Sequence, residues 1–293
     1  MIEALQNDGA AYRCTESCAA LGVSRSGFYA QGTKAQRSRR LEDQRLSQEL
    51  SLAFRQSRAT YGSRRLQQML LRQGRRCGRN RILRLMRRLE LNVIQKRRFR
   101  PTTTQSRHDQ PLAPNRLKQL AQRPSAPNQV WCADLTYLPS QKEGWLYLAA
   151  ELDLCSRRLL GWKLSTSSTT PLVKEAFERA VKRWSLCPKI HHSDRGVQYA
   201  SNAFTQLLNS HQVLASMSRK GHCYDNAAIE SFWATLKAEC FHHQIPLDLP
   251  HAQALLFDYI ETFYNPLRLH SALGYLSPLE FENLLTSKLL LKT

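Results

Sequence analysis

The sequence predicts an α/β protein in which a five-stranded mixed sheet with flanking helices is preceded by small all-α domains of the helix-turn-helix type. Three observations predict this fold class. Residues 130–138 form an apolar, β-branched run that is the strongest strand signal in the chain, and strand and helix patterns alternate after it. Residues 1–127 carry helical patterns instead. Nearly all of the excess positive charge lies in this first part.

The charge divides the chain unevenly. Residues 1–127 contain 27 Lys and Arg against 8 Asp and Glu, a net +19, whereas residues 128–293 are nearly neutral at +1. A chain of 293 residues is also long enough for more than one folded unit. The asymmetry indicates a polyanionic partner, DNA or RNA, because Lys and Arg release counterions from phosphates. A solvated basic surface and ribosome-type basicity remain alternatives.

Cysteine usage and hydropathy indicate the compartment. The eight cysteines show no Cys-x-x-Cys pair and no zinc-finger spacing, and the start of the chain does not resemble a signal peptide. No apolar stretch is long enough for a membrane span. We therefore expect a soluble protein of the bacterial cytoplasm, with free thiols and no membrane partner.

Two helical pairs are predicted in the basic part. Residues 12–20 and 24–29 fit a helix-turn-helix with Arg25 at the start of its second helix, although an ordinary helical hairpin fits equally well. Residues 31–40 are polar and are interpreted as a linker, followed by a helix at 41–56.

The second pair begins at Ser63, which we expect to cap a helix that ends at Gly74, and Asn80 starts the next helix. Like charges crowd this last helix and oppose its formation, a cost that bound phosphate would offset. We therefore predict contacts with the DNA backbone here. The arginines concerned are Arg79, Arg81, Arg84, Arg87 and Arg88.

These patterns divide the chain into four parts. They are a helix-turn-helix-like segment at 1–35, a basic helical DNA-binding domain at 36–95, a basic Pro-rich linker at 96–127 and a domain of strands and helices at 128–293. The linker is able to lie along DNA, although a spacer without contacts remains open.

Residues 128–293 have a regular order of predicted elements. Strands at 145–154 and 158–164 follow the first strand closely, which predicts an antiparallel meander. The remaining elements are a helix at 170–184, a strand at 189–192, a helix at 202–210, a strand at 213–217, a helix from Asn226, and helices at 249–264 and 278–291. We expect the last segments to pack on the core or to contact a second subunit.

Three acidic residues occupy unusual positions in this pattern. Asp134 lies in the middle of the first strand, Asp194 follows the strand at 189–192, and Glu230 stands on a helix whose entry is marked by Asp225 and Asn226. A buried aspartate needs a partner, and an arginine or backbone amides would suffice for any one of them. Three converging carboxylates favour divalent metal.

The sequence motifs around these acidic residues resemble those of one protein family. They are Trp131-x-x-Asp134-x-Thr136-Tyr137, His192-Ser193-Asp194-Arg195-Gly196-x-Gln198-Tyr199, Ser216-Met217-Ser218-x-x-Gly221-x-x-Tyr224-Asp225-Asn226-Ala227, Glu230-Ser231-Phe232 and Tyr264-Asn265-x-x-Arg268-x-His270. With 35 residues between Asp194 and Glu230, the set resembles the acidic triad of the integrase and transposase superfamily, which has an RNase H-like core. The whole chain resembles the catalytic OrfB-type protein of bacterial insertion sequences.

This resemblance implies a site and its cofactor. Asp134, Asp194 and Glu230, here called the acidic triad, are expected to hold two Mg²⁺ ions, with Mn²⁺ as a substitute. Lys237, two turns after Glu230, is expected to hold a phosphate, although a surface lysine remains the alternative. Further DNA contacts are expected from His192, Arg195 and Lys220.

The resemblance also implies an activity and partners. The expected protein is a transposase that cuts at the inverted-repeat ends of its element and joins the freed 3′-hydroxyl to target DNA. It would act on the nucleoid as a homo-oligomer, with an upstream-frame (OrfA-type) partner or as a fusion to it. A non-catalytic, sequence-specific DNA-binding protein or repressor is the alternative, and a general RNase H-like nuclease is a third hypothesis.

Overall fold

The chain forms two compact units, Met1–Asn92 and Val93–Thr293. The computed structural model describes residues 14–20, 22, 24, 26, 34–93, 110–120, 122, 124–219, 226–241 and 244–290. Within these ranges no helix combines the length and apolarity that crossing a bilayer requires.

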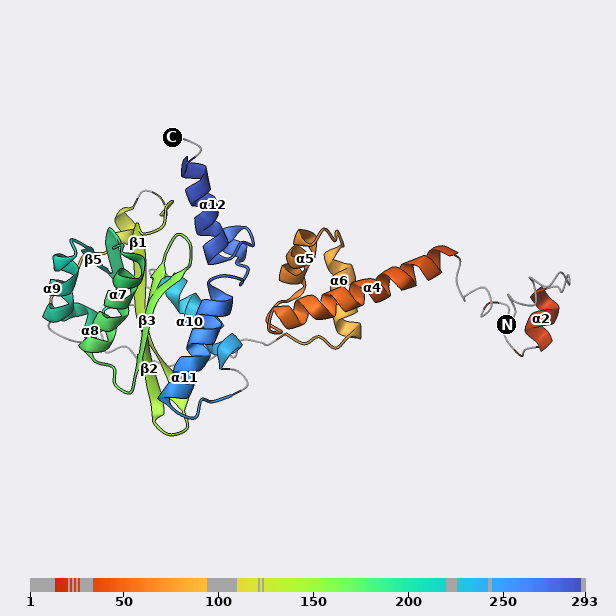
Figure 1. Ribbon diagram of the computed structural model, residues 1–293, viewed down its shortest axis with the longest axis horizontal. Helices are drawn as coiled ribbons and strands as arrows, with labels where there is room; N and C mark the ends of the chain where they lie inside the picture. The colour runs from red at the N-terminus through yellow and green to blue at the C-terminus, as the bar shows by residue number, and fades with distance from the viewer. Residues whose placement is uncertain are drawn as a thin grey trace. The chain divides into compact units, whose positions relative to one another are not determined.

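The first unit is helical, as predicted. Its helices are α2 (Cys14–Ala20), α4 (Lys34–Gln56), α5 (Ser63–Arg72) and α6 (Arg79–Arg88) (Figure 1). The last three pack around side chains with no exposed surface, namely Leu50, Leu66, Leu70, Ile82 and Leu85. The helix predicted at 24–29 falls almost entirely outside the described residues.

Two local predictions in this unit were wrong. The linker predicted at 31–40 is helical from Lys34 onward, because lysine, alanine, glutamine and arginine favour a helix even without an apolar stripe. Ser63 does not cap α5. Gly62 occupies the cap position with extended backbone, and no side chain caps the helix there.

The second unit contains the predicted mixed sheet. Its strands are β1 (Val130–Ser140), β2 (Gly144–Asp153), β3 (Leu159–Ser165), β4 (Ile190–Ser193) and β5 (Leu214–Met217). They lie in the order β3-β2-β1-β4-β5. The first three pair antiparallel, whereas β4 is parallel to both β1 and β5. The meander and the two later strands were therefore predicted correctly.

One face of the sheet is covered by α7 (Thr170–Trp184), α8 (Val197–Ala200) and α9 (Asn202–Ser210) (Figure 1). Trp131 and Ala133 of β1 share a buried cluster with Phe177 of α7 and Phe204 of α9. Helix α7 approaches β3 so closely that a Cβ at Gly161 would lie 2.5 Å from a backbone oxygen of α7. This strand position therefore requires glycine.

The opposite face carries α10 (Ala227–Cys240) and α11 (Leu249–Phe257) (Figure 1). The single helix predicted at 249–264 changes after Phe257 into a π-helical segment, η3 (Asp258–Tyr264). The wider turn places Tyr259 and Tyr264 on one side, with ring centroids 6.1 Å apart and both rings buried. Aromatic packing overrides the α-helical pattern here.

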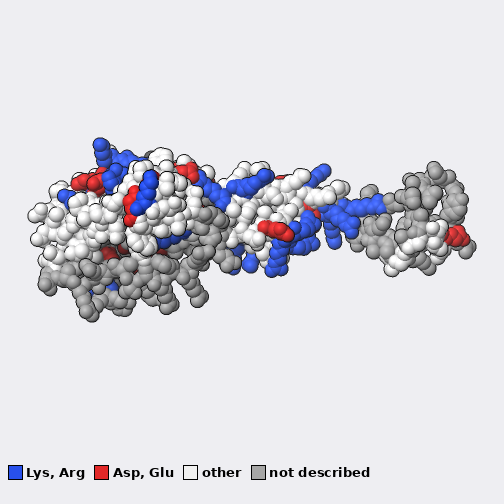
Figure 2. Space-filling view, turned by 90° about the horizontal axis from the view of Figure 1, so that it is seen from below, with Lys and Arg blue, Asp and Glu red and all other residues white. Residues whose placement is uncertain are grey.

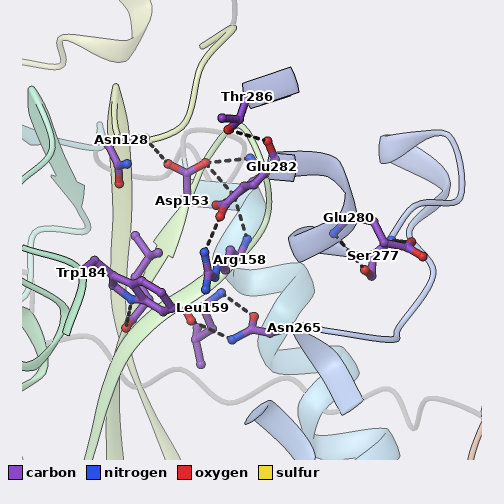
Figure 3. A network of polar contacts seen from close by, with 12 residues as sticks. Asn128, Asp153, Arg158, Leu159, Trp184, Asn265, Ser277, Glu280, Glu282 and Thr286 are labelled. Carbon is purple, nitrogen blue, oxygen red and sulfur yellow. Dashed lines mark hydrogen bonds and ion pairs between the residues drawn. The ribbon is translucent and has the colours of Figure 1, made fainter. Parts of the chain in front are cut away.

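The C-terminal segments pack back on the sheet. After the short η4 (Ser271–Leu273), helix α12 (Pro278–Leu290) places Glu282 against Arg158 and Ser156 (Figure 3). Asn265 bonds both the N–H and the C=O of Leu159 at 3.0 Å, which continues the backbone pairing of edge strand β3. The packing alternative predicted for these segments is confirmed.

Part of the predicted linker also contacts the core. Arg116, just before η1 (Leu117–Gln119), donates its backbone N–H to Ser216 at 2.9 Å and its Nε to the Ala215 carbonyl at 3.2 Å. These bonds attach this part of the chain to β5.

Candidate active site

Asp134 projects from β1 towards α10. Side chains alternate along a strand, so Ala133 enters the cluster beneath α7 while Asp134 turns to the other face. There the indole Nε1 of Trp233 donates to Asp134 Oδ2 at 2.9 Å. Burial raises the pKa of Asp134 to about 8, and the charges of Asp194 and Glu230 add to this rise.

Asp194 follows the last residue of β4, the strand next to β1. The Gly196 N–H donates to Asp194 Oδ1 at 2.9 Å, which closes a tight turn. A Cβ at Gly196 would also lie 2.9 Å from this oxygen, so the turn favours glycine. The parallel register pairs Cys132 of β1 with His192 of β4, and Asp134 and Asp194 each follow two residues later, which explains how they come within electrostatic reach.

Glu230 lies in the first turn of α10, and its side chain is exposed. Nearby protein atoms still desolvate its carboxyl enough to raise the pKa, and Asp194 raises it further. Asp194 thus acts on both other members of the acidic triad. Within the described ranges, however, no group of three or more His, Cys, Asp or Glu is close enough to hold a metal ion as it stands.

Lys237 lies on the same side of α10 as the triad. Its Nζ is 4.6 Å from the ring centroid of Tyr137. Burial lowers the pKa of Lys237, and the negative charge of Asp134 partly opposes that shift. A simple solvated lysine, the alternative left open by the sequence, does not describe this environment.

A pocket of about 560 Å³ opens beside the two aspartates. Asp134 and Asp194 line it together with Tyr137, Trp145 and Tyr147. No role was predicted for these aromatic residues, because strand periodicity explains each of them without a ligand. Trp233 was assigned to the apolar face of its helix, although a buried indole N–H needs an acceptor and this need could have indicated its bond to Asp134.

Two polar groups of the quoted motifs are buried near this site. Asn226 stands at the cap position of α10 but makes no capping bond, contrary to our prediction, and donates instead to the Ala133 carbonyl at 3.4 Å. Its Oδ1 and the Tyr199 hydroxyl have no hydrogen-bond partner among the residues that the structure describes. Asp225, the other predicted cap, lies outside those residues.

His192 and Arg195, two predicted DNA contacts of the second unit, both bond to neighbouring residues of the protein. His192 is fully buried and its Nδ1 lies 2.8 Å from the Ser216 hydroxyl. Arg195 donates its Nε to the Ser218 carbonyl at 2.8 Å. The burial of His192 corrects the prediction of a DNA contact there, because strand β4 alternates it into the protein. Lys220 and Arg25 lie outside the described residues.

Arginines are prominent on the surface of the first unit (Figure 2), but those of α6 differ in their contacts. Arg81 and Arg84 bind Asp43 of α4 at 2.7 and 2.6 Å. Arg88 donates to the Ser47 hydroxyl at 3.0 Å. These three side chains hold α6 against α4, which the sequence could not indicate. Arg79 and Arg87 are exposed.

Comparisons with known proteins agree with this architecture. Residues 124–223 and 211–278 match integrase core domain models, and residues 41–99 match an HTH-like domain model. The chain is 44% identical over 267 residues to the insertion element IS600 uncharacterized 31 kDa protein of Shigella sonnei, covering 90% of this chain and 96% of that protein. It is 39% identical over 273 residues to transposase InsF for insertion sequence IS3A of Escherichia coli (strain K12), covering 91% and 92%.

A similar solved structure is the HTLV-2 integrase catalytic core domain in complex with magnesium. That match has 18% identity and a TM-score of 0.43, and it covers 55% of this chain and 99% of that chain.

Proposed function

This chain belongs to the family of insertion-sequence transposases with an integrase core domain, and on that premise we propose that it cuts DNA at the ends of its element and transfers the freed 3′-hydroxyl to target DNA. Both steps are attacks by an oxygen nucleophile on a phosphodiester, so one site can perform them. The acidic triad is the proposed catalytic centre.

One observation carries this proposal. Asp194 raises the pKa of both Asp134 and Glu230, so the fold keeps carboxyl groups near each other although their charges repel. A divalent cation would relieve this repulsion, and carboxylate oxygens are the ligands that Mg²⁺ prefers. The donor set therefore fits Mg²⁺, and we propose that the acidic triad holds two ions, with Mn²⁺ as a substitute.

Residues around the acidic triad orient its carboxyl groups. Trp233 binds only Oδ2 of Asp134 and thereby fixes the direction in which this carboxyl presents its other oxygen. The Gly196 N–H holds Asp194 in the same way. When bound, Mg²⁺ supplies activation of the attacking hydroxyl and charge stabilisation of the leaving oxygen. Lys237 contributes positive charge for a phosphate beside Asp134.

DNA and protein partners complete the proposal. The HTH-like unit would bind the DNA backbone through exposed arginines such as Arg79 and Arg87, while Arg81 and Arg84 keep α6 in place. We further propose that the protein works as a homo-oligomer on DNA and together with an upstream-frame partner.

The test uses purified protein and labelled DNA that carries the element ends, with the upstream-frame product supplied. Strand cleavage and joining are expected with Mg²⁺ or Mn²⁺ and not with EDTA. Asp194→Asn should lower the cleavage rate at least about a hundredfold, because loss of a metal ligand removes several kcal/mol of transition-state stabilisation. DNA binding by this variant should remain.

Other outcomes would reject the proposal. DNA binding without metal-dependent cleavage would favour the repressor hypothesis, and cleavage of unrelated RNA–DNA hybrids would favour a general nuclease. An Asp194→Asn variant that cleaves as fast as the unmodified protein would remove the acidic triad from the mechanism.

A further inference from the structure

Three aromatic side chains form a wall at one end of the sheet. Tyr137 and Tyr147 are direct partners in the β1–β2 register, and Trp145 follows on the same face. The rings of Tyr137 and Trp145 meet edge to face, with centroids 5.0 Å apart. Trp145 is nonetheless 49% exposed. The wall therefore leaves a large flat apolar surface in contact with water.

This wall belongs to the same pocket as the aspartates. Tyr137, Trp145 and Tyr147 line the cavity of about 560 Å³ into which Asp134 and Asp194 also face, and we call it the aromatic pocket. Its volume lies within the range of about 300–1,000 Å³ typical of small-ligand sites. Gln198 and Ser168 supply its polar edge, where the Gln198 amide donates to the Ser168 carbonyl at 2.8 Å.

The wall is held in position before any ligand arrives. Lys237 lies over the Tyr137 ring at 4.6 Å, and Trp145 packs on the edge of that ring. A cation above an aromatic face is an attractive arrangement that limits the motion of both groups. The ring is therefore preorganised, which lowers the entropic cost of stacking a ligand on it.

The chemistry of the aromatic pocket selects a flat, uncharged group. Its wall is aromatic rather than basic, and a nucleobase is neutral and has two aromatic faces that stack on Tyr or Trp. If the acidic triad acts on a phosphodiester, the nearest base belongs to the nucleotide that carries the scissile phosphate. We propose that the aromatic pocket receives a nucleobase unstacked from the DNA beside the scissile phosphate, with Trp145 as its stacking partner.

This proposal rests on the proposed function, because it assumes that the acidic triad acts on DNA. It adds a separate binding step: the base leaves the DNA stack and enters the aromatic pocket. Stacking supplies the favourable energy, and the unstacking cost is smallest near a frayed end or a break. An element end would thus be held by its base as well as by its phosphates.

The test is a coupling experiment on the full chain with element-end DNA, with Ca²⁺ in place of Mg²⁺ to keep the DNA intact. Affinity is measured for Trp145→Ala and Trp145→Phe on normal DNA and on DNA with an abasic nucleotide at each position flanking the scissile phosphate. Phe257→Ala is the matched control, since Phe257 is 58% exposed on α11 and lines a different groove.

Trp145→Ala should weaken binding of normal DNA at least about fivefold, the smallest loss expected for one stacked base. At one abasic position, the affinity of the unmodified protein should be lower than for normal DNA by the same factor. Trp145→Ala should bind that abasic DNA as tightly as it binds normal DNA. Trp145→Phe should retain most of the affinity, and Phe257→Ala should match the unmodified protein. The fluorescence of 2-aminopurine at that position should change on binding to the unmodified protein and not on binding to Trp145→Ala, because the base exchanges its DNA neighbours for the Trp145 ring.

The outcomes separate the two proposals. If the protein cuts element ends but Trp145→Ala and the abasic sites act additively at every position, the aromatic pocket does not bind a base and the proposed function stands. If the protein neither binds nor cuts element ends under any metal condition, both proposals fail.

Discussion

The two ends of helix α10 differ in the surroundings of their glutamate side chains. Near its C-terminus, Glu239 accepts two bonds from Arg268, at 2.7 and 2.6 Å, and a third from the Tyr259 hydroxyl at 2.8 Å. Near its N-terminus, Glu230 faces a second carboxyl, Asp194, which raises its pKa. One helix therefore has a neutralised acid at one end and a repelled acid at the other.

This comparison distinguishes a carboxylate that stabilises the fold from carboxylates that are available for a ligand. Burial alone would lower the pKa of Arg268, but the hydrogen bonds and charge of Glu239 raise it above its usual value, which is typical of a permanent ion pair. Among the described residues, the side-chain donor to Asp134 is the neutral Trp233 indole, and the pKa of Asp134 rises to about 8. The second arrangement is stable in the charged state only with an added cation.

The first prediction breaks the neutralised end. Arg268→Met should reduce the free energy of unfolding by about 3–5 kcal/mol, because it leaves Glu239 buried without its cation. Urea unfolding measures this loss. The control is Arg75→Met, which removes an exposed two-bond pair with Glu49 and should cost at most about 1 kcal/mol. Equal losses in both variants would contradict the distinction.

The second prediction breaks the repelled end. Glu230→Gln should leave the free energy of unfolding within about 0.5 kcal/mol, because the side chain is exposed. Mg²⁺-dependent cleavage should nevertheless fall at least about a hundredfold. Glu178→Gln on α7, another exposed glutamate, should change neither quantity. Full cleavage activity in Glu230→Gln would show that the mechanism does not use this carboxyl.

The third prediction concerns the orientation of Asp134. Trp233→Phe removes the indole donor, so the pKa of Asp134 should rise further above about 8. Residues that hydrogen-bond to a metal ligand typically contribute about 10- to 100-fold to metal affinity or activity. We therefore expect half-maximal cleavage to require a Mg²⁺ concentration about tenfold higher. Trp162→Phe, which removes an indole bond to Glu261, is the control and should leave the Mg²⁺ dependence unchanged.

The fourth prediction is a pH dependence of stability. Asp134 has its pKa raised from 3.8 to about 8 by folding, so between these values the folded state binds more protons than the unfolded state. Its stability contribution is therefore lost as pH rises. Without metal, Asp134→Asn should be more stable than the unmodified protein by roughly 5 kcal/mol at pH 8, since each pKa unit corresponds to about 1.4 kcal/mol, with the difference vanishing near pH 4. Thermal unfolding across this range measures it, and a pH-independent difference would contradict the shift.

Sequence patterns predicted the elements better than their contacts. The β1 strand, the meander and α7 follow from apolar periodicity, because that periodicity reflects burial. The strand order came with the family resemblance, since periodicity does not say which strands pair. The π-helical η3 depends on aromatic packing between distant elements, and the extra turns of α4 contain no apolar residues that would reveal them.

The candidate site shows the same limit. Asp134 was conspicuous because aspartate is depleted in strands, and Asp194 and Glu230 joined it through the resemblance. The Trp233 bond to Asp134 and the Arg81 bond to Asp43 each join residues far apart in the chain. No local pattern specifies such partners, so the sequence did not show that three of the five arginines predicted to contact DNA also bond to α4.

The most direct measurement is anomalous diffraction from crystals of the protein grown with Mn²⁺. We predict Mn²⁺ bound between the carboxylates of Asp134 and Asp194, with Glu230 turned towards it, and no such density in crystals of Asp134→Asn. At saturating Mn²⁺, an acidic triad that stays free of metal, or metal bound only elsewhere in the protein, would contradict the claim that these carboxylates are held together for a shared cation.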